Sequence, residues 1–235
     1  MATLKRETSM SDPIIRTSNL HRIYHGAGGD VHAINAVSLD IQPGVMTAVA
    51  GRSGAGKTTL LNLLCGLDQP DEGQVWIHDT DLYALSEAAR TALRREKIGF
   101  IFQHFGLLPL LNAAENVSVP LRMRRLDRRE REHRVLEALE MVGLRERAKH
   151  RPYELSGGEQ QRVAIARALV AHPEIILADE PTGQLDSHTG RRVLNVMRHL
   201  ASEQGLTMVI VTHDPQAMDE ADVVYHLHDG GLVDA

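Results

Sequence analysis

Aromatic residues, cysteine and long apolar runs are all scarce in this sequence, and each shortage excludes a class of protein. Only 3% of the 235 residues are aromatic, so the hydrophobic core must be aliphatic. The single cysteine, Cys65, rules out a disulfide within the chain and suits a reducing cytosol; we expect a small buried apolar residue there. No apolar run approaches the roughly 18–20 residues that span a bilayer, and the polar N-terminus lacks a secretory signal. We therefore expect a cytosolic protein.

An excess of positive charge is also missing. The chain has 31 acidic residues against 26 Lys and Arg, a formal net charge of -5. Nucleic-acid binding needs a basic surface, so we expect no nucleic-acid partner. Arginine is dense only in RMRRLDRREREHR at 122–134. We interpret this segment as a solvated helical face with many salt bridges, the alternative being a surface for acidic partners or lipid head groups.

Strand and helix patterns alternate along the chain, which predicts an α/β fold with a mostly parallel sheet covered by helices. We expect a loose tail at 1–13 and one domain over 14–235. Ligands of such sheets bind beyond the carboxyl ends of the strands. The segments with strand patterns are 14–24, 31–42, 45–51, 74–78, 97–103, 174–179, 207–213 and 222–228. The helical patterns follow the loop at 51–59 and cover 113–150, 159–171 and 187–202.

A glycine-rich loop follows the strand expected at 45–51. Residues 51–58 read GRSGAGKT and fit G-x-x-x-x-G-K-[ST], whose backbone N–H groups and helix N-terminus converge on phosphates. Lys57 is expected to reach the β- and γ-phosphates, and the Thr58 hydroxyl to join a Mg²⁺ shell. A chance match in a glycine-rich turn is the alternative, but the flanking strand and helix are the context that the mechanism requires. The predicted nucleotide-binding residues here are Gly51, Arg52, Ser53, Gly54, Ala55, Gly56, Lys57, Thr58 and Thr59.

Polar residues end three of the expected strands, where the phosphates should lie. Asp179 and Glu180 follow an apolar strand and must point to opposite sides, so their roles differ. Asp179 is the expected partner of Mg²⁺ opposite Thr58, and Glu180 is placed to polarise water. Gln103 and His213 end two further strands. From its position alone, His213 is as consistent with a capping or surface histidine as with a phosphate contact.

A second loop raises a separate question. Residues 154–162 read ELSGGEQQR, with paired glycines at the start of an expected helix. Such a helix start can bind an anion. A single site needs only the first loop, about a hundred residues earlier, so the second must serve another purpose.

Taken in order, these motifs resemble the nucleotide-binding subunit of an ABC transporter, over about 14–235 of the chain. The motifs are GRSGAGKT, FQ at 102–103, LSGGEQQR, LADEP, LD at 185–186 and TH at 212–213. The resemblance implies a P-loop NTPase core, an N-terminal antiparallel β subdomain and a helical signature subdomain at approximately 104–165. It also implies ATP and Mg²⁺ as cofactors.

The resemblance also implies roles for single residues. Gln103 would sense Mg²⁺, which it helps to bind, and would couple to a membrane partner. Glu180 would be the general base, and His213 would contact the γ-phosphate. Tyr24 is similar to the aromatic residue that stacks on adenine, and Asp186 would lie in the loop that crosses a dimer interface.

The second loop then has a purpose. By the resemblance, Ser156, Gly157 and Gly158 would close on the γ-phosphate held by Lys57 of another subunit. The implied partners are a second ATP-binding subunit, identical in a homodimer, and an integral-membrane permease. The chain would then be a cytoplasmic subunit held peripherally on the inner face of the cell membrane.

Longer stretches, among them LLNLLCGLDQPDEGQVWI, resemble the MacB/LolD/FtsE-like group. Its members serve lipoprotein release, macrolide or peptide export, or division signalling. A soluble ABC-type ATPase that regulates a non-transport process is the alternative, although such chains carry two nucleotide domains or a long coiled coil. A phosphotransferase or GTPase is a weaker alternative, because neither uses LSGGEQQR.

Overall fold

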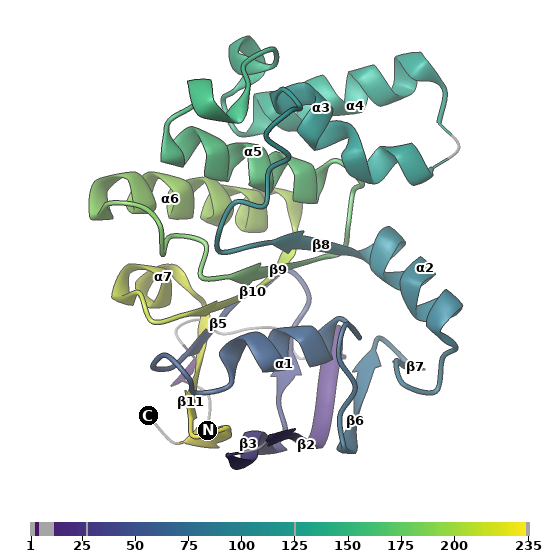
Figure 1. Ribbon diagram of the computed structural model, residues 1–235, viewed down its shortest axis with the longest axis vertical. Coiled ribbons are helices and arrows are strands. Elements are labelled where there is room, and N and C mark those ends of the chain that lie inside the picture. The colour runs from purple at the N-terminus through teal and green to yellow at the C-terminus, as the bar shows by residue number, and fades with distance from the viewer. Residues whose placement is uncertain (1–2, 5–11, 27, 125, 234–235) are drawn as a thin grey trace.

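A seven-stranded, mostly parallel sheet forms the centre of the computed structural model, which describes residues 3–4, 12–26, 28–124 and 126–233 (Figure 1). The strand order is β1-β11-β5-β10-β9-β8, and β12 pairs with β11. All pairs from β11 to β8 are parallel, and β1 and β12 add antiparallel edges. The strands are β1 Thr3–Leu4, β5 Met46–Ala50, β8 Ile98–Ile101, β9 Ile175–Asp179, β10 Thr207–Thr212, β11 Val223–His228 and β12 Gly231–Val233.

The central strands are apolar throughout because both faces of the sheet are covered. In β9, Ile175 and Leu177 pack into the core on one side, whereas Ile176 and Ala178 pack into the core on the other. This two-residue alternation also sends Asp179, the last residue of β9, and its neighbour Glu180 in different directions.

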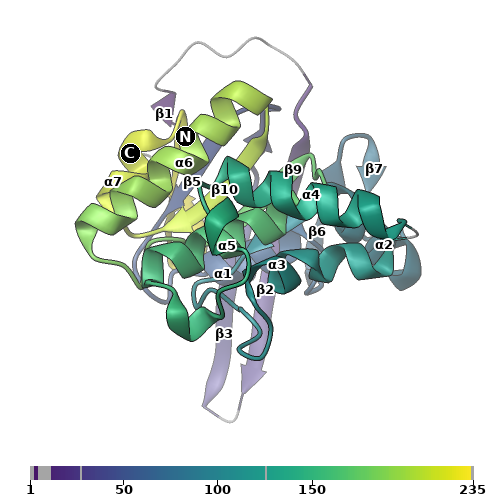
Figure 2. The same ribbon diagram turned by 90° about the horizontal axis from the view of Figure 1, so that it is seen from above.

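Helix α1 (Lys57–Leu64) lies between the central sheet and a second, antiparallel sheet (Figure 1). The antiparallel sheet has the order β3-β2-β6-β7, with β4 paired to β2, and its β2–β3 hairpin extends away from the helices (Figure 2). Its strands are β2 Ile15–Gly26, β3 Gly29–Val37, β4 Asp40–Ile41, β6 Glu72–Ile77 and β7 Thr80–Asp81. Leucines of α1 join both sheets in one aliphatic core, as the scarcity of aromatics predicts. Cys65 is buried there, and burial raises the pKa of its thiol to about 11, confirming an inert apolar role.

The other face of the central sheet is covered by helices (Figure 1). They are α3 Ala113–Ser118, α4 Arg128–Met141, α5 Gly157–Leu169 and α6 Ser187–Gln204, with short 3-10 turns η1 Val119–Met123, η2 Arg145–Arg147 and η3 Pro152–Glu154. The second half of the arginine-rich segment, from 128 on, forms the first half of α4, where Arg128 pairs with Glu132 at 2.7 Å and Arg134 with Glu130 at 2.6 Å. The expected solvated face with i,i+4 salt bridges is present on this helix.

Two helices were not expected from the sequence: α2 (Glu87–Lys97) and the short α7 (Pro215–Glu220). Helix α2 buries no residue fully, and its apolar side is limited to alanines and Leu93, which packs against the core. It is also held by its Ser86 cap and by Glu87, which pairs with arginines one and two turns later. Helix α5 begins at Gly157, two residues before the expected start. Most of the expected tail at 1–13 lies outside the described residues.

Candidate functional site

The glycine-rich loop joins β5 to α1 and folds around the amine of Lys57. Gly56 has φ 98°, and a Cβ there would clash with the carbonyl oxygen of Ala33, so only glycine fits. The Lys57 side chain is buried, and its Nζ donates to the carbonyls of Gly51 at 2.7 Å and Arg52 at 3.0 Å. A buried ammonium at a helix N-terminus makes this loop strongly attractive to an anion.

A cavity of about 690 Å³ opens above this loop and collects most of the predicted residues. Predicted residues that line it are Tyr24, Ser53, Gly54, Gly56, Lys57, Thr58, Thr59, Gln103, Glu180 and His213. Segments up to about 190 residues apart in sequence therefore meet at one site. The predicted residues that do not line the cavity are Gly51, Arg52, Ala55, Asp179, Ser156, Gly157 and Gly158.

Asp179 and Thr58 form the candidate Mg²⁺ site. The Thr58 hydroxyl donates to Asp179 Oδ2 at 2.9 Å, while the buried Oδ1 has no hydrogen-bond partner among the described residues. Burial raises the pKa of Asp179, and the nearby Glu180 carboxylate adds to the rise. A hard divalent cation offsets both effects and takes carboxylate and hydroxyl oxygens as ligands, so these residues fit Mg²⁺. Gln103, which borders the same cavity, can supply a further oxygen.

The Glu180 carboxylate is held from several directions. Its Oε1 lies 3.2 Å from Lys57 Nζ and 2.9 Å from His213 Nδ1, and its Oε2 accepts from the Thr212 hydroxyl at 3.2 Å. The backbone of Glu180 itself has φ 45°, a strained conformation for a non-glycine residue. The carboxylate is therefore positioned at the cavity by contacts from two separate segments, the start of α1 and the end of β10.

The Gln103 loop is tied to α5 by one arginine. Arg167 donates to the carbonyls of Phe105 at 2.8 Å and Gly106 at 2.5 Å. Phe105 and Gly106 both have positive φ, so the loop makes a tight turn just after the glutamine. Burial lowers the pKa of Arg167, which forms no ion pair within the described part of the chain. Arg167 therefore links α5 directly to the loop that carries Gln103.

The ELSGGEQQR loop lies apart from the cavity. Ser156 is exposed and caps α5: its Oγ accepts from Glu159 N, and its own N donates to Glu159 Oε2 at 2.9 Å. Gly157 is half-buried beside Leu185, and Gly158 is buried. The capped N-terminus of α5 begins at an exposed residue, Ser156, where a second molecule can reach it.

Comparisons with known proteins agree with this geometry. Residues 34–183 match the family model described as ABC transporter. The chain is 44% identical to the lipoprotein-releasing system ATP-binding protein LolD of Pseudomonas syringae over 227 residues, 96% of this chain and 100% of that protein. It is also 44% identical to an uncharacterized ABC transporter ATP-binding protein of Methanocaldococcus jannaschii, with 92% and 94% of the two chains covered. The dimeric structure of that archaeal cassette in a post-hydrolysis state, bound to ADP and Pi, matches with a TM-score of 0.85 at 42% identity, covering 94% of this chain and 97% of that one.

The chain belongs to the ABC transporter family. The predicted α/β fold and the predicted ATP-binding, ATP-hydrolysing subunit with Mg²⁺ as cofactor are thereby confirmed. Within the described ranges 3–4, 12–26, 28–124 and 126–233, no helix is long and apolar enough to cross a bilayer.

Four residues of the cassette's cavity were missed by the sequence interpretation: Val31, His32, Ala33 and Asp229. The first three lie on β3, opposite Tyr24 in the hairpin, where Tyr24 pairs with Val31. Asp229 lies in the β11–β12 turn with φ 45°. None belongs to a motif, and only the pairing of β2 with β3 could have pointed to the β3 residues.

Gly158 is needed for packing as well as for the loop. A Cβ there would clash with Thr189 Cγ2 of α6, and Thr189 also hydrogen-bonds Asp186, which caps that helix. We expect Gly158→Ala to lower the free energy of unfolding by about 1–3 kcal/mol, the usual cost of overpacking. Urea denaturation measures this directly. Gly157→Ala, whose Cβ meets only Leu185 Cδ2 at 3.3 Å and Phe105 at 3.8 Å, is the matched control and should cost less; equal losses would contradict the packing role.

Proposed function

We propose that this cassette dimerises around two ATP molecules and drives an integral-membrane partner that works in lipoprotein release or export. The relatives support this narrower function. Besides LolD, the chain is 44% identical to the macrolide export ATP-binding/permease protein MacB of Agrobacterium fabrum, covering 95% of this chain and 34% of that protein. The cassette would then be held at the inner face of the cell membrane by its partner.

The observation that carries the membrane partner is an apolar groove beside the Gln103 loop. It encloses about 570 Å³ between α2, β8, η1 and α5. Three of its large apolar side chains are open to solvent: Phe102 is 47% exposed, Leu108 48% and Met123 71%. An apolar groove that gathers several such side chains is typical of an interaction site.

The charges around the groove favour a helix with an acidic residue. Arg94, Arg95 and Arg167 line the same groove, and Arg167 forms no ion pair among the residues that the structure describes. A carboxylate arriving with a partner helix would offset the buried guanidinium charge. Because Arg167 also holds the turn after Gln103, the docked helix would sense the state of the ATP site.

Within one subunit, the chain's own residues suggest the order of events. Lys57 now contacts backbone carbonyls and Glu180, so it must turn toward an arriving phosphate. That movement removes the ammonium from Glu180 Oε1, which keeps its contact with His213 Nδ1, and the carboxylate would then accept a proton from water. Bound Mg²⁺ would polarise the phosphate and neutralise its charge. Closure against the Ser156 loop of the other subunit would move α5, and we treat approximately 104–165 as the helical unit that moves.

Membrane association tests the docking groove. In cells producing the tagged cassette, we expect Leu108→Glu combined with Met123→Glu to reduce the membrane-bound fraction by about tenfold or more, the effect of losing central apolar contacts. Sedimentation of membranes, followed by an alkaline wash that releases peripheral proteins, provides the measurement. Basal ATPase activity of the purified variant should be unchanged.

The matched control is Leu67→Glu, because Leu67 is 57% exposed but lies in the loop after α1, outside the groove. It should leave membrane association intact. Wild-type protein found entirely in the soluble fraction would favour the soluble regulatory ATPase instead. Equal loss with the control would show that the groove is not the docking surface.

A further inference from the structure

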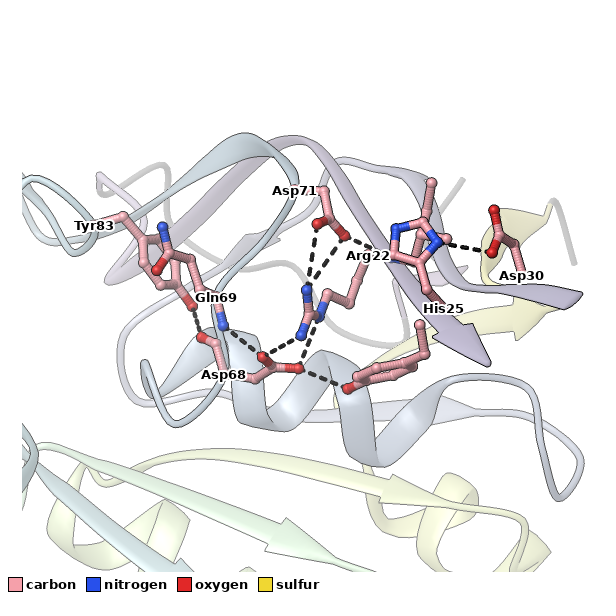
Figure 3. A network of polar contacts seen from close by, with 9 residues as sticks. Arg22, His25, Asp30, Asp68, Gln69, Asp71 and Tyr83 are labelled. Atoms are coloured by element: carbon pink, nitrogen blue, oxygen red, sulfur yellow. Dashed lines mark hydrogen bonds and ion pairs between the residues drawn. The ribbon is translucent and has the colours of Figure 1, made fainter. Parts of the chain in front are cut away.

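A compact polar network surrounds Tyr24, which lines the ATP cavity. Figure 3 shows Arg22, Asp68 and Asp71 of this network together. The Tyr24 hydroxyl donates to Asp68 Oδ2 at 2.6 Å. Arg22 binds the same carboxylate in a bidentate manner, with Nε to Oδ2 at 3.0 Å and Nη2 to Oδ1 at 2.8 Å. The Arg22 guanidinium also lies over the Tyr24 ring, 4.7 Å from its centroid. The ring is thus held at its hydroxyl and over one face.

The network is anchored to two further segments. Asp71 accepts from Ile23 N at 2.7 Å and lies 3.3 Å from Arg22 Nη1, so it fixes the strand between Arg22 and Tyr24. Asp68 itself lies in the loop after α1, the helix whose other end forms the phosphate loop. Burial opposes the charge of Asp68, but hydrogen bonds from Tyr24, Gln69 N and Arg22 outweigh it and lower its pKa. The carboxylate is therefore a charged, well-satisfied acceptor.

We propose that Asp68 and Arg22 are positioning residues that hold the Tyr24 ring in the orientation that receives the adenine base. The proposal rests on the proposed role of Tyr24 in stacking. Tyr24 is 40% exposed, and without its hydroxyl anchor an exposed ring would sample several rotamers. Only the rotamer that faces the base can then stack on it. The apparent affinity for the nucleotide falls in proportion to the fraction of molecules that hold this rotamer. The hydroxyl matters here although it need not touch the nucleotide.

Plain stacking makes a different prediction from anchored stacking. If the ring alone mattered, Phe would replace Tyr24 without loss. With the anchor, Tyr24→Phe and Asp68→Ala should each weaken ADP binding by about 3–10-fold, the effect of one hydrogen bond on rotamer populations. Asp68→Asn retains an acceptor for the Tyr24 hydroxyl, so its ADP affinity should fall less than that of Asp68→Ala. Arg22→Gln removes the guanidinium over the ring and should weaken ADP binding by about the same factor as Tyr24→Phe.

Calorimetric titration of the purified protein with ADP and with inorganic pyrophosphate tests this. Pyrophosphate uses only the phosphate loop, so its affinity should stay within about twofold in every variant, which also shows that each variant is folded. Tyr225→Phe, whose hydroxyl bonds the Asp40 carbonyl at 2.9 Å, is the control for the tyrosine change. Arg16→Gln, which removes a guanidinium 4.7 Å from the Trp76 ring on neighbouring strands, is the control for the arginine change.

The same titrations distinguish two errors: a wrong positioning role for Asp68 and Arg22, and a wrong stacking role for Tyr24. Unchanged ADP affinity in Tyr24→Ala would mean that the base binds elsewhere, which removes the assignment of Tyr24 itself. A weakened Tyr24→Ala beside an unchanged Tyr24→Phe would keep the stacking role and overturn the positioning role. Parallel losses of ADP and pyrophosphate affinity would also overturn it, since the network would then act on the whole fold.

Discussion

Replacing Glu180 with glutamine is expected to slow steady-state ATP turnover by about 10²–10⁴-fold, the contribution typical of a positioned general base. Glutamine keeps the size of the side chain, and its single amide oxygen can still accept one of the hydrogen bonds made to the Glu180 carboxylate, but it cannot take a proton from water. ATP binding should persist because the phosphate loop is untouched. A phosphate-release assay measures turnover, and size-exclusion chromatography with ATP and Mg²⁺ should show dimers that accumulate because they cannot reopen.

The control for Glu180→Gln is the same change at Glu174, which accepts from His78 at 2.7 Å and pairs with Lys97, and which does not line the cavity. This variant should hydrolyse ATP at close to the wild-type rate. Rapid turnover retained in Glu180→Gln would reject Glu180 as the base. His213, 2.9 Å from the same carboxylate, would then be the next group to test.

The site shows what a sequence can and cannot predict. Lys57, Asp179 and Glu180 were found because each occupies a fixed place relative to an apolar strand, and strands are recognisable by burial on both faces. Asp68 was not found, since it reaches Tyr24 only through a contact 44 residues away in sequence. Pairings of this kind depend on how two sheets sandwich α1, which no local pattern records.

The helices and strands show the same difference between features with a local sequence pattern and features without one. Strands β5, β9 and β10 are continuous apolar runs and were predicted within about two residues. Helix α2 was missed because it is short, has a single large apolar residue, Leu93, against the core, and is otherwise stabilised by side-chain pairs such as Glu87 with Arg90 and Arg94. The start of α5 was placed two residues late, although Ser156 and Glu159 form the S-x-x-E capping box that indicates a helix start in a sequence.

A substitution in the exposed ELSGGEQQR loop is also expected to have a large effect on ATP hydrolysis. Ser156→Arg should abolish ATP-dependent dimerisation and reduce hydrolysis to background, because a long cation would fill the space that a second subunit's phosphate must enter. Binding of ATP to the single subunit should remain, since Ser156 does not line its own cavity. Ser202→Arg, at an exposed serine near the end of α6, is the matched control and should change neither property.

Mixing two inactive variants distinguishes a loop that works across subunits from one that works within its own. Lys57→Ala cannot bind the phosphates, and Ser156→Arg cannot close on them. In a mixed dimer, the intact Lys57 of one subunit meets the intact Ser156 of the other, so one of the two sites is whole. Random pairing of equal amounts should restore about a quarter of the wild-type activity if paired subunits share their sites across a two-fold interface. If each subunit instead used its own loop, every site in the mixture would carry one defect and the mixture would stay inactive, which makes recovery the direct evidence that ELSGGEQQR completes a neighbour's site.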